Sequence, residues 1–181
     1  MQWECPINIL EFTNPTESLP AILHLLRNAP TDFNLPIVFN CHLYGSPIFY
    51  EITSEIVDVW LPDLRYGNDQ CAKRLSGVED YLEYAEQGLK AMVNSGSKII
   101  VRILVLPGHG KCCHEPAINL LSKYKDNIKI SILDQYVPEH KALDDYVLKS
   151  SPSIEQLANI KDLVHQYRLN DIEADRGIFS K

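Results

Sequence analysis

The segment KIIVRILVLPGH, residues 98–109, carries the strongest structural signal in the chain. Its first nine residues are rich in isoleucine and valine, which favour β-strands. Pro107 and Gly108 then end the run, as is typical where a strand gives way to a loop. Because a near-continuous apolar strand is typical of a parallel sheet covered on both faces, we expect a strand over residues 98–106 that is buried on both sides.

Four further strands and four helices are predicted around this segment. The strands are expected at residues 7–12, 36–40, 56–61 and 127–133. The helices are expected from Thr16 or Ser18 onward and over residues 78–93, 115–124 and 153–167. Ser153 and Gln156 have the spacing of a capping box, which marks the start of the last helix. Strands that alternate with helices indicate βαβ units, and therefore an α/β fold with a mostly parallel sheet.

The length of 181 residues fits a single domain, and the polar stretch over residues 171–181 is expected to fray. Five strands are too few to close an eight-stranded barrel. The sheet is therefore either a small open one or a piece of a larger barrel. Because the chain enters a buried-looking strand almost at once, we favour the piece of a barrel.

The composition excludes several classes of partner and points to one compartment. With 17 Lys and Arg against 24 Asp and Glu, the net charge is −7, which argues against binding to nucleic acid or to an anionic membrane. The N-terminus shows no targeting signal, and no run is long enough to span a bilayer. Five irregularly spaced cysteines make a poor disulfide framework, so we expect a cytoplasmic protein.

Polar or ionisable side chains follow all five predicted strands. In parallel α/β folds, ligands bind beyond the carboxyl ends of the strands, so these side chains are expected to share one rim of the sheet. Five such ends together predict a binding site, with ordinary solvated loops as the alternative. The side chains concerned are Asn14 and Glu17, Asn40 and His42, Asp63 and Arg65, His109, and Asp134 with Gln135.

Arg102 lies inside the predicted strand over residues 98–106, where alternation places it on the same face as Leu104 and Leu106. An arginine in a buried strand needs a partner, because an unpaired buried charge costs several kcal/mol. Asp63, Glu17 or the carboxylate of a ligand would suit its guanidinium fork. A purely structural ion pair with an aspartate is the alternative to a ligand site.

The run from His109 to His114 contains two adjacent cysteines between two histidines. It has neither the CxxC nor the HxxxH spacing of common zinc sites, and Cys112 and Cys113 do not easily reach one tetrahedral ion together. We therefore assign no metal ligands here and favour a glycine turn that leads into a helix, where a thiol pKa would be lowered. A Cys/His hydrolase or metalloprotein built on these four residues is kept as an alternative. No P-loop, dinucleotide-binding, α/β-hydrolase or zincin motif is present.

Five segments in the same order resemble radical S-adenosylmethionine (SAM) enzymes of the pyruvate formate-lyase activating type. Residues 101–109 are similar to the fifth-strand segment of that family, residues 61–67 to its fourth, residues 35–40 to its third, residues 131–138 to its sixth, and residues 15–23 to the helix after its second strand. The resemblance extends from about Ile7 to Tyr167 and implies a partial (β/α) barrel of the radical SAM type that lacks its first βα unit.

The chain departs from the family pattern in two places. The CxxxCxxC motif, which binds a [4Fe–4S] cluster in the family, is absent, and Cys5 stands alone. The glycine-rich Gly-Gly-Glu-Pro segment of the family is replaced by residues 12–15, Phe-Thr-Asn-Pro. These bulkier residues are expected to hinder the close approach of SAM to the backbone that glycine allows.

The resemblance implies a set of cofactor-binding residues and no catalytic or metal-ligating ones. Asp63 and Arg65 would lie near the amino and carboxylate groups of SAM, and Arg102 would face the carboxylate. Asn14 and Asn40 would line the methionine side, with Gln135 or His140 on the ribose or adenine side. The full set is Asn14, Asn40, Asp63, Arg65, Arg102, Gln135 and His140.

The function that the resemblance implies is that of the C-terminal portion of a radical SAM oxidoreductase. Such enzymes cleave SAM reductively and abstract hydrogen, here from a glycyl radical enzyme as protein substrate. This chain alone is expected to be inactive, because an upstream segment or a partner must supply the cysteines for the [4Fe–4S] cluster. The alternative is a non-catalytic module without a cluster that binds SAM, a related nucleoside or a partner protein. An exposed sheet edge would also allow self-association.

Overall fold

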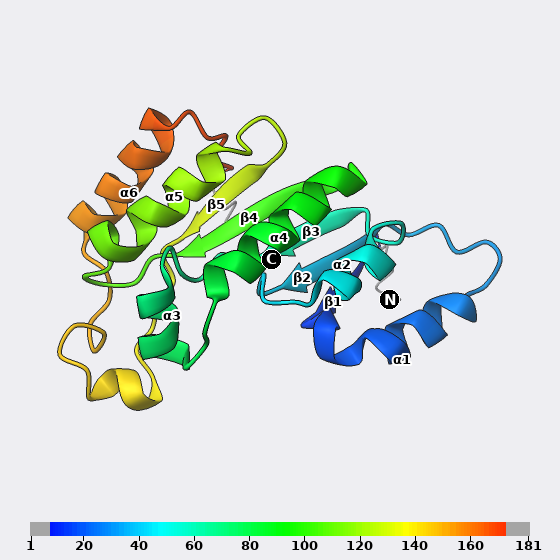
Figure 1. The fold of residues 1–181 in the computed structure, drawn as a ribbon, viewed down its shortest axis with the longest axis horizontal. Helices are drawn as coiled ribbons and strands as arrows, with labels where there is room; N and C mark the ends of the chain where they lie inside the picture. Colours follow the sequence, from blue (N-terminus) through cyan, green and yellow to red (C-terminus); the bar gives the residue numbers. More distant parts are fainter. Residues whose placement is uncertain (1–7, 173–181) are drawn as a thin grey trace, which may run out of the picture.

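The computed structural model describes residues 8–172, which form one parallel five-stranded sheet with helices packed against it (Figure 1). The strands run in the order β1-β2-β3-β4-β5, and every neighbouring pair is parallel. Their bounds are β1 (Leu10–Thr13), β2 (Ile37–Cys41), β3 (Val59–Pro62), β4 (Lys98–Leu104) and β5 (Lys129–Leu133). The α/β fold predicted from the sequence is therefore confirmed.

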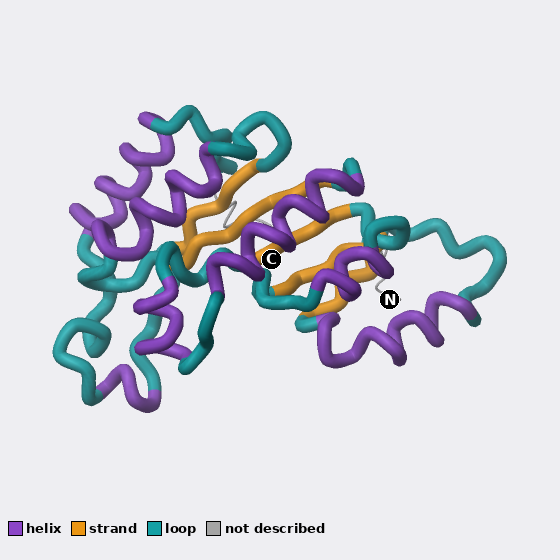
Figure 2. Tube along the Cα trace, in the orientation of Figure 1, coloured by secondary structure: helices purple, strands orange, loops and turns teal. Residues whose placement is uncertain are grey.

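The helices occupy the connections between consecutive strands and the segment that follows β5. These are α1 (Pro15–Arg27), α2 (Pro47–Thr53), α3 (Asp69–Ser76), α4 (Tyr81–Ser95), α5 (Glu115–Ser122) and α6 (Ile154–Gln166), with a π-helical turn η1 (Gly110–His114) and a 3₁₀ turn η2 (His140–Leu143). Because parallel strands in sequential order are joined by right-handed crossovers, the helices fall on one face of the sheet. Figures 1 and 2 show α2 and α4 crossing in front of the strands.

The residues of β4 show what this one-sided arrangement does to burial. Ile99, Val101 and Ile103 are buried beneath the helices, whereas Ile100 and Arg102 are half-buried on the opposite face. The expected burial of this strand on both faces is therefore wrong. The apolar residues of the second face line an open concave surface, as in part of a barrel, rather than packing under a second layer of helices.

The core between the sheet and the helices is built around aromatic side chains. Trp60 of β3 is 1% exposed and Phe39 of β2 is fully buried. Their ring centroids lie 5.5 Å apart in an edge-to-face arrangement. Phe49 and Tyr50 of α2 pack on the same indole, with centroids 6.3 and 6.1 Å away. This cluster fixes α2 over the centre of the sheet, although α2 has only 7 residues and was missed in the sequence.

The helix ends follow local chemistry. The predicted capping box is confirmed, because Gln156 N donates to Ser153 Oγ at 3.1 Å and Ser153 N donates to Gln156 Oε1 at 2.9 Å. Helix α4 begins at Tyr81 rather than Val78, because Asp80 has a left-handed backbone with φ of 52°. Helix α3 was also missed, since it has only 8 residues and most of them are polar.

The two ends of the described chain differ in part from expectation. Strand β1 begins at Leu10, and Cys5 and Ile7 lie outside the described residues. Ile130 N donates to Asn170 O at 2.9 Å, and Ile172 N donates to Ile130 O at 2.8 Å, so residues 170–172 pair along the outer edge of β5. The expected fraying is therefore wrong for Asp171 and Ile172, whereas residues 173–181 are outside the described range. None of the helices within residues 8–172 has the length and apolar character needed to cross a membrane.

Candidate functional site

Arg102 and Asp63 form an ion pair on the concave face, at the carboxyl ends of β3 and β4. Arg102 Nε lies 2.7 Å and Nη2 lies 2.6 Å from Asp63 Oδ1. The two residues are neighbours because the chain after β3 continues alongside β4, so that Asp63 and Arg102 form a parallel bridge. Both side chains are about a quarter exposed, at 28% and 24%. Among the partners considered for Arg102, the structure selects Asp63.

The ion pair is one end of a polar chain that crosses four adjacent strands. Arg102 Nη2 donates to Asn40 Oδ1 at 2.5 Å, and Asn40 Nδ2 donates to Glu11 Oε1 at 2.9 Å. Glu17 instead lies 3.7 Å from His42 Nε2. Glu11 was missed in the sequence, although its place inside an apolar strand is the same signal that singled out Arg102. The contacts show that one face of β1, β2 and β4 carries linked polar groups.

A cavity of about 590 Å³ opens beside this ion pair. Asp63, Arg65, Arg102 and Gln135 supply polar groups to its wall, and apolar groups come from Leu104, Leu106, Leu133 and Tyr136. The predicted alternation along residues 98–106 is thereby confirmed, because Arg102, Leu104 and Leu106 line the same cavity. A cavity of this size with a few convergent polar groups is typical of a small-molecule site.

The remaining predicted site residues are spread along the same rim. Asn14 caps α1 with a left-handed φ of 51°, and its backbone N donates to Asn40 O at 2.9 Å. Arg65 Nη2 lies 3.9 Å from Asp63 Oδ2. His140 is exposed at the start of η2 and is not part of the cavity wall, whereas Gln135 is. The structure thus brings Asp63, Arg65, Arg102 and Gln135 together in the cavity wall and leaves Asn14, Asn40 and His140 outside it, although Asn40 is bonded to Arg102.

The four Cys and His residues of the segment from His109 to His114 do not converge on one point. Leu106 N donates to His114 Nε2 at 3.1 Å, and Gly67 N donates to the Cys113 thiol at 3.1 Å. Burial raises the pKa of Cys113 to about 12, and burial together with the neighbouring Cys71 thiol raises the pKa of Cys112. The expected lowering of thiol pKa at a helix N-terminus is therefore wrong, because loss of water around the sulfur atoms outweighs the helix end.

His114 is expected to make the stability of the fold depend on pH. Burial lowers its pKa below the ordinary value of 6.5, so the unfolded chain takes up a proton before the folded chain does. The free energy of unfolding should therefore keep its full value above about pH 6.5 and decrease as the pH drops below it. Urea unfolding of wild type and His114→Gln between pH 7.5 and 5 checks this, with the exposed His24→Gln as matched control. A variant at position 114 with the pH slope of wild type would contradict the assignment.

No protein-family model matches the chain. It is 31% identical over 157 residues to an uncharacterised protein of Methanocaldococcus jannaschii, a match that covers 87% of this chain and 45% of that protein. The chain thus spans about half the length of the curated relative that it matches.

Two solved structures share the architecture. A domain of a pyruvate-formate lyase-activating enzyme from Bacteroides vulgatus superposes with a TM-score of 0.68 at 13% identity, covering 90% of this chain and 97% of that one. A radical SAM methyltransferase from Sphaerobacter thermophilus superposes with a TM-score of 0.63 at 11% identity, covering 92% of this chain and 50% of that one. The chain therefore shares the α/β fold of these two structures.

Proposed function

We propose that this chain binds S-adenosylmethionine and supplies the SAM-binding portion of a radical SAM protein. The observation that carries the proposal is the Arg102–Asp63 pair in the wall of the cavity, because it presents both charges that a free α-amino acid group requires. The cavity has room for a ligand larger than a free amino acid, since sites for drug-sized ligands have volumes of roughly 300 to 1,000 Å³.

The two charged groups each keep hydrogen-bonding capacity for a ligand. Within residues 8–172, Arg102 uses Nε and Nη2 for its contacts with Asp63 and Asn40, and Nη1 makes no hydrogen bond. Nη1 can therefore donate to a ligand carboxylate. Asp63 Oδ1 accepts from Arg102, whereas Oδ2 has Arg65 at 3.9 Å, beyond hydrogen-bonding distance. Oδ2 can accept from a ligand ammonium group, so the methionine moiety of SAM matches the pair.

The rest of the cavity suits the nucleoside end of the same ligand. Leu104, Leu106 and Leu133 form an apolar wall, and Tyr136 adds an aromatic ring. Gln135 offers both a donor and an acceptor, as recognition of a ribose or adenine edge requires. Apolar walls with a few placed polar groups are the usual composition of sites for cofactors.

The [4Fe–4S] cluster of the family does not fit the residues of this chain. Its cysteines, at positions 5, 41, 71, 112 and 113, contain no CxxxCxxC spacing. Reductive cleavage of SAM and hydrogen abstraction from a glycyl radical enzyme therefore require cluster ligands from outside these residues. Without them, the same cavity makes the chain a binding module for SAM. The outer side of β1 has no neighbouring strand within the described residues, and we propose this edge as the place where another chain or segment joins.

Titration calorimetry with SAM and decarboxylated SAM tests the proposal. Wild type should bind SAM more tightly, because Arg102 contacts the carboxylate that the analogue lacks. A charge-assisted hydrogen bond contributes roughly 1.5 to 3 kcal/mol, so Arg102→Met should weaken SAM binding by about 10- to 100-fold and change binding of the analogue much less. Asp63→Asn should weaken both ligands, because both carry the ammonium group.

The controls separate ligand binding from loss of folding. Arg27→Met removes an arginine in the last turn of α1, away from the cavity wall, and should bind SAM as wild type does. Circular dichroism of each variant verifies that the fold is retained. Absence of SAM binding by the wild-type chain, or unchanged discrimination between the two ligands in Arg102→Met, would overturn the proposal.

A further inference from the structure

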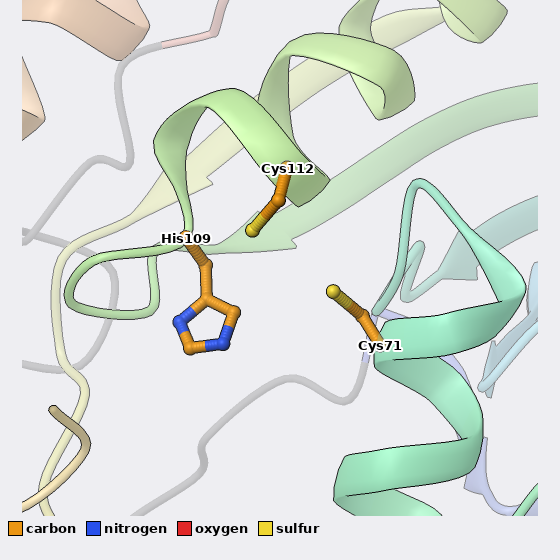
Figure 3. A group of neighbouring side chains, drawn as sticks. All are labelled: Cys71, His109 and Cys112. Atoms are coloured by element: carbon orange, nitrogen blue, oxygen red, sulfur yellow. The ribbon is translucent and has the colours of Figure 1, made fainter. Parts of the chain in front are cut away.

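Two thiols and an imidazole converge at the carboxyl rim, outside the cavity proposed for SAM. Cys71 lies in the first turn of α3, and His109 and Cys112 lie in the connection from β4 to α5. Their ligand atoms are all within 4.8 Å of one another. Figure 3 shows the two sulfur atoms and the His109 ring facing one shared space. From this geometry we propose that Cys71, His109 and Cys112 bind a zinc ion.

The donor set matches the chemistry of zinc. Thiolates and imidazole are the ligands that Zn²⁺ prefers, at about 2.3 Å for sulfur and 2.0 Å for nitrogen. Ligand atoms around one tetrahedral ion are therefore roughly 3.5 to 4 Å apart. The present separations need to close by only about 1 Å, which side-chain rotation supplies. Three protein ligands leave the fourth position open, and Cys112 is exposed, so water can reach the ion.

A hydrogen bond on one ring nitrogen of His109 leaves the other nitrogen with a lone pair that can bind a cation. Its Nδ1 lies 2.7 Å from the carbonyl oxygen of Pro107 and donates to it, which leaves the lone pair on Nε2. Such a second hydrogen bond is the usual support of a metal-binding histidine. Nε2 faces Arg74 Nη2 at 2.6 Å, so a guanidinium cation occupies the direction in which a metal would bind. Asp145 Oδ2, at 3.4 Å from Arg74 Nη1, retains the guanidinium when the metal displaces it.

Asn68 holds the two cysteine segments together. Its Oδ1 accepts from Cys71 N at 2.7 Å, and its Nδ2 lies 3.3 Å from the Cys71 sulfur and donates to the carbonyl of Cys112. One side chain thereby fixes the N-terminus of α3, a ligand sulfur and the backbone of the second ligand. The site is built by the packing of two loops rather than by a chance approach of surface thiols.

The neighbouring Cys113 and His114 are not among the proposed ligands, although the Cys113 thiol also interacts with the thiols of Cys71 and Cys112. Both are buried, with the Cys113 thiol accepting from Gly67 N and His114 Nε2 accepting from Leu106 N. The proposed set therefore shares His109 and Cys112 with the four candidates of the sequence and replaces Cys113 and His114 by Cys71, where the sequence assigned no metal ligand. Cys71 was missed because metal-ligand motifs consist of residues close in sequence, whereas Cys71 lies in the connection between β3 and β4.

Metal analysis of the whole chain tests the inference directly. After removal of metals with a chelator and reloading with zinc, wild type should retain one zinc per chain. Cobalt substituted at the site should show thiolate-to-cobalt charge-transfer absorption. Cys71→Ser and Cys112→Ser should each lose affinity by more than the roughly 10- to 100-fold typical of losing an outer hydrogen-bond partner. Cys113→Ala, which removes an adjacent thiol that is not a proposed ligand, should lose much less affinity than either of these variants.

Arg74→Met provides a test in the opposite direction. Since Arg74 competes for His109 Nε2, its removal should raise the zinc affinity, which a purely structural role of the cluster does not predict. Absence of zinc in the wild-type chain, equal losses in Cys71→Ser and Cys113→Ala, or iron with sulfide in place of zinc would overturn the inference. SAM titration of Cys71→Ser should match wild type, so the zinc site and the SAM site succeed or fail separately.

Discussion

Gly67→Ala is expected to destabilise the fold by about 3 kcal/mol or more, at the upper end of overpacking substitutions. A Cβ at position 67 would lie 1.9 Å from the carbonyl oxygen of Cys113 and 2.5 Å from the backbone nitrogen of Ala117. Both atoms belong to the backbone, one in η1 and one in the first turn of α5, so no side-chain rotation relieves the overlap. The loop after β3 would have to move away from α5, and the hydrogen bond from Gly67 N to Cys113 would break.

Urea unfolding measures this effect, with Gly110→Ala as matched control. Gly110 lies in the neighbouring segment η1, and an added Cβ there meets no atom within 4 Å. The control should therefore stay within about 1 kcal/mol of wild type, as is usual for a site without a special structural role. Similar unfolding midpoints for the two variants would show that the close approach of the loop to α5 is not required.

Trp60→Ala is expected to lower the free energy of unfolding by about 3 to 5 kcal/mol, as is typical of removing a buried aromatic side chain. Trp60 is 1% exposed and contacts the rings of Phe39, Phe49 and Tyr50. Its removal leaves a cavity between the centre of the sheet and α2. Because natural domains are stable by only about 5 to 15 kcal/mol, this single change removes a large share of the total.

Trp60→Phe separates the loss of packing from the loss of the indole N–H. Within residues 8–172, Trp60 Nε1 is buried without a hydrogen-bond partner, so phenylalanine removes an unpaired polar group while it retains an aromatic ring. Thermal and urea unfolding should show a clearly smaller loss for Trp60→Phe than for Trp60→Ala. Equal losses would mean that the phenyl ring recovers none of the packing that the indole ring provides.

One face of the sheet packs into the core and stabilises the fold, whereas the other carries the residues of the proposed binding site. Trp60 and Ile103 point into the core beneath the helices, whereas Arg102 lies on the concave face with Asp63. Alternation along a strand places neighbouring residues on opposite faces, so one strand contributes to both. Polar groups on the concave face can therefore change without opening the core, which makes Arg102→Met and Asp63→Asn suitable variants for binding experiments.

The alternation within residues 98–106 was readable from the sequence, because side chains of a strand point to opposite faces with a period of two. It correctly placed Arg102, Leu104 and Leu106 on one face. The capping box of Ser153 and Gln156 was equally readable, since both of its hydrogen bonds lie within one helical turn. The sharing of one rim by the five strand ends was readable too, because parallel strands place their carboxyl ends together.

Long-range contacts decided the rest, since residues far apart in sequence meet only when loops pack. Asp63 rather than Glu17 pairs with Arg102 because the chain after β3 continues beside β4. Cys71 joins His109 and Cys112 because Gly67 lets two strand connections approach closely and Asn68 bonds to both of them. Local periodicity thus established the strands and their faces, whereas the ion pair and the thiol cluster depend on distances that no single segment encodes.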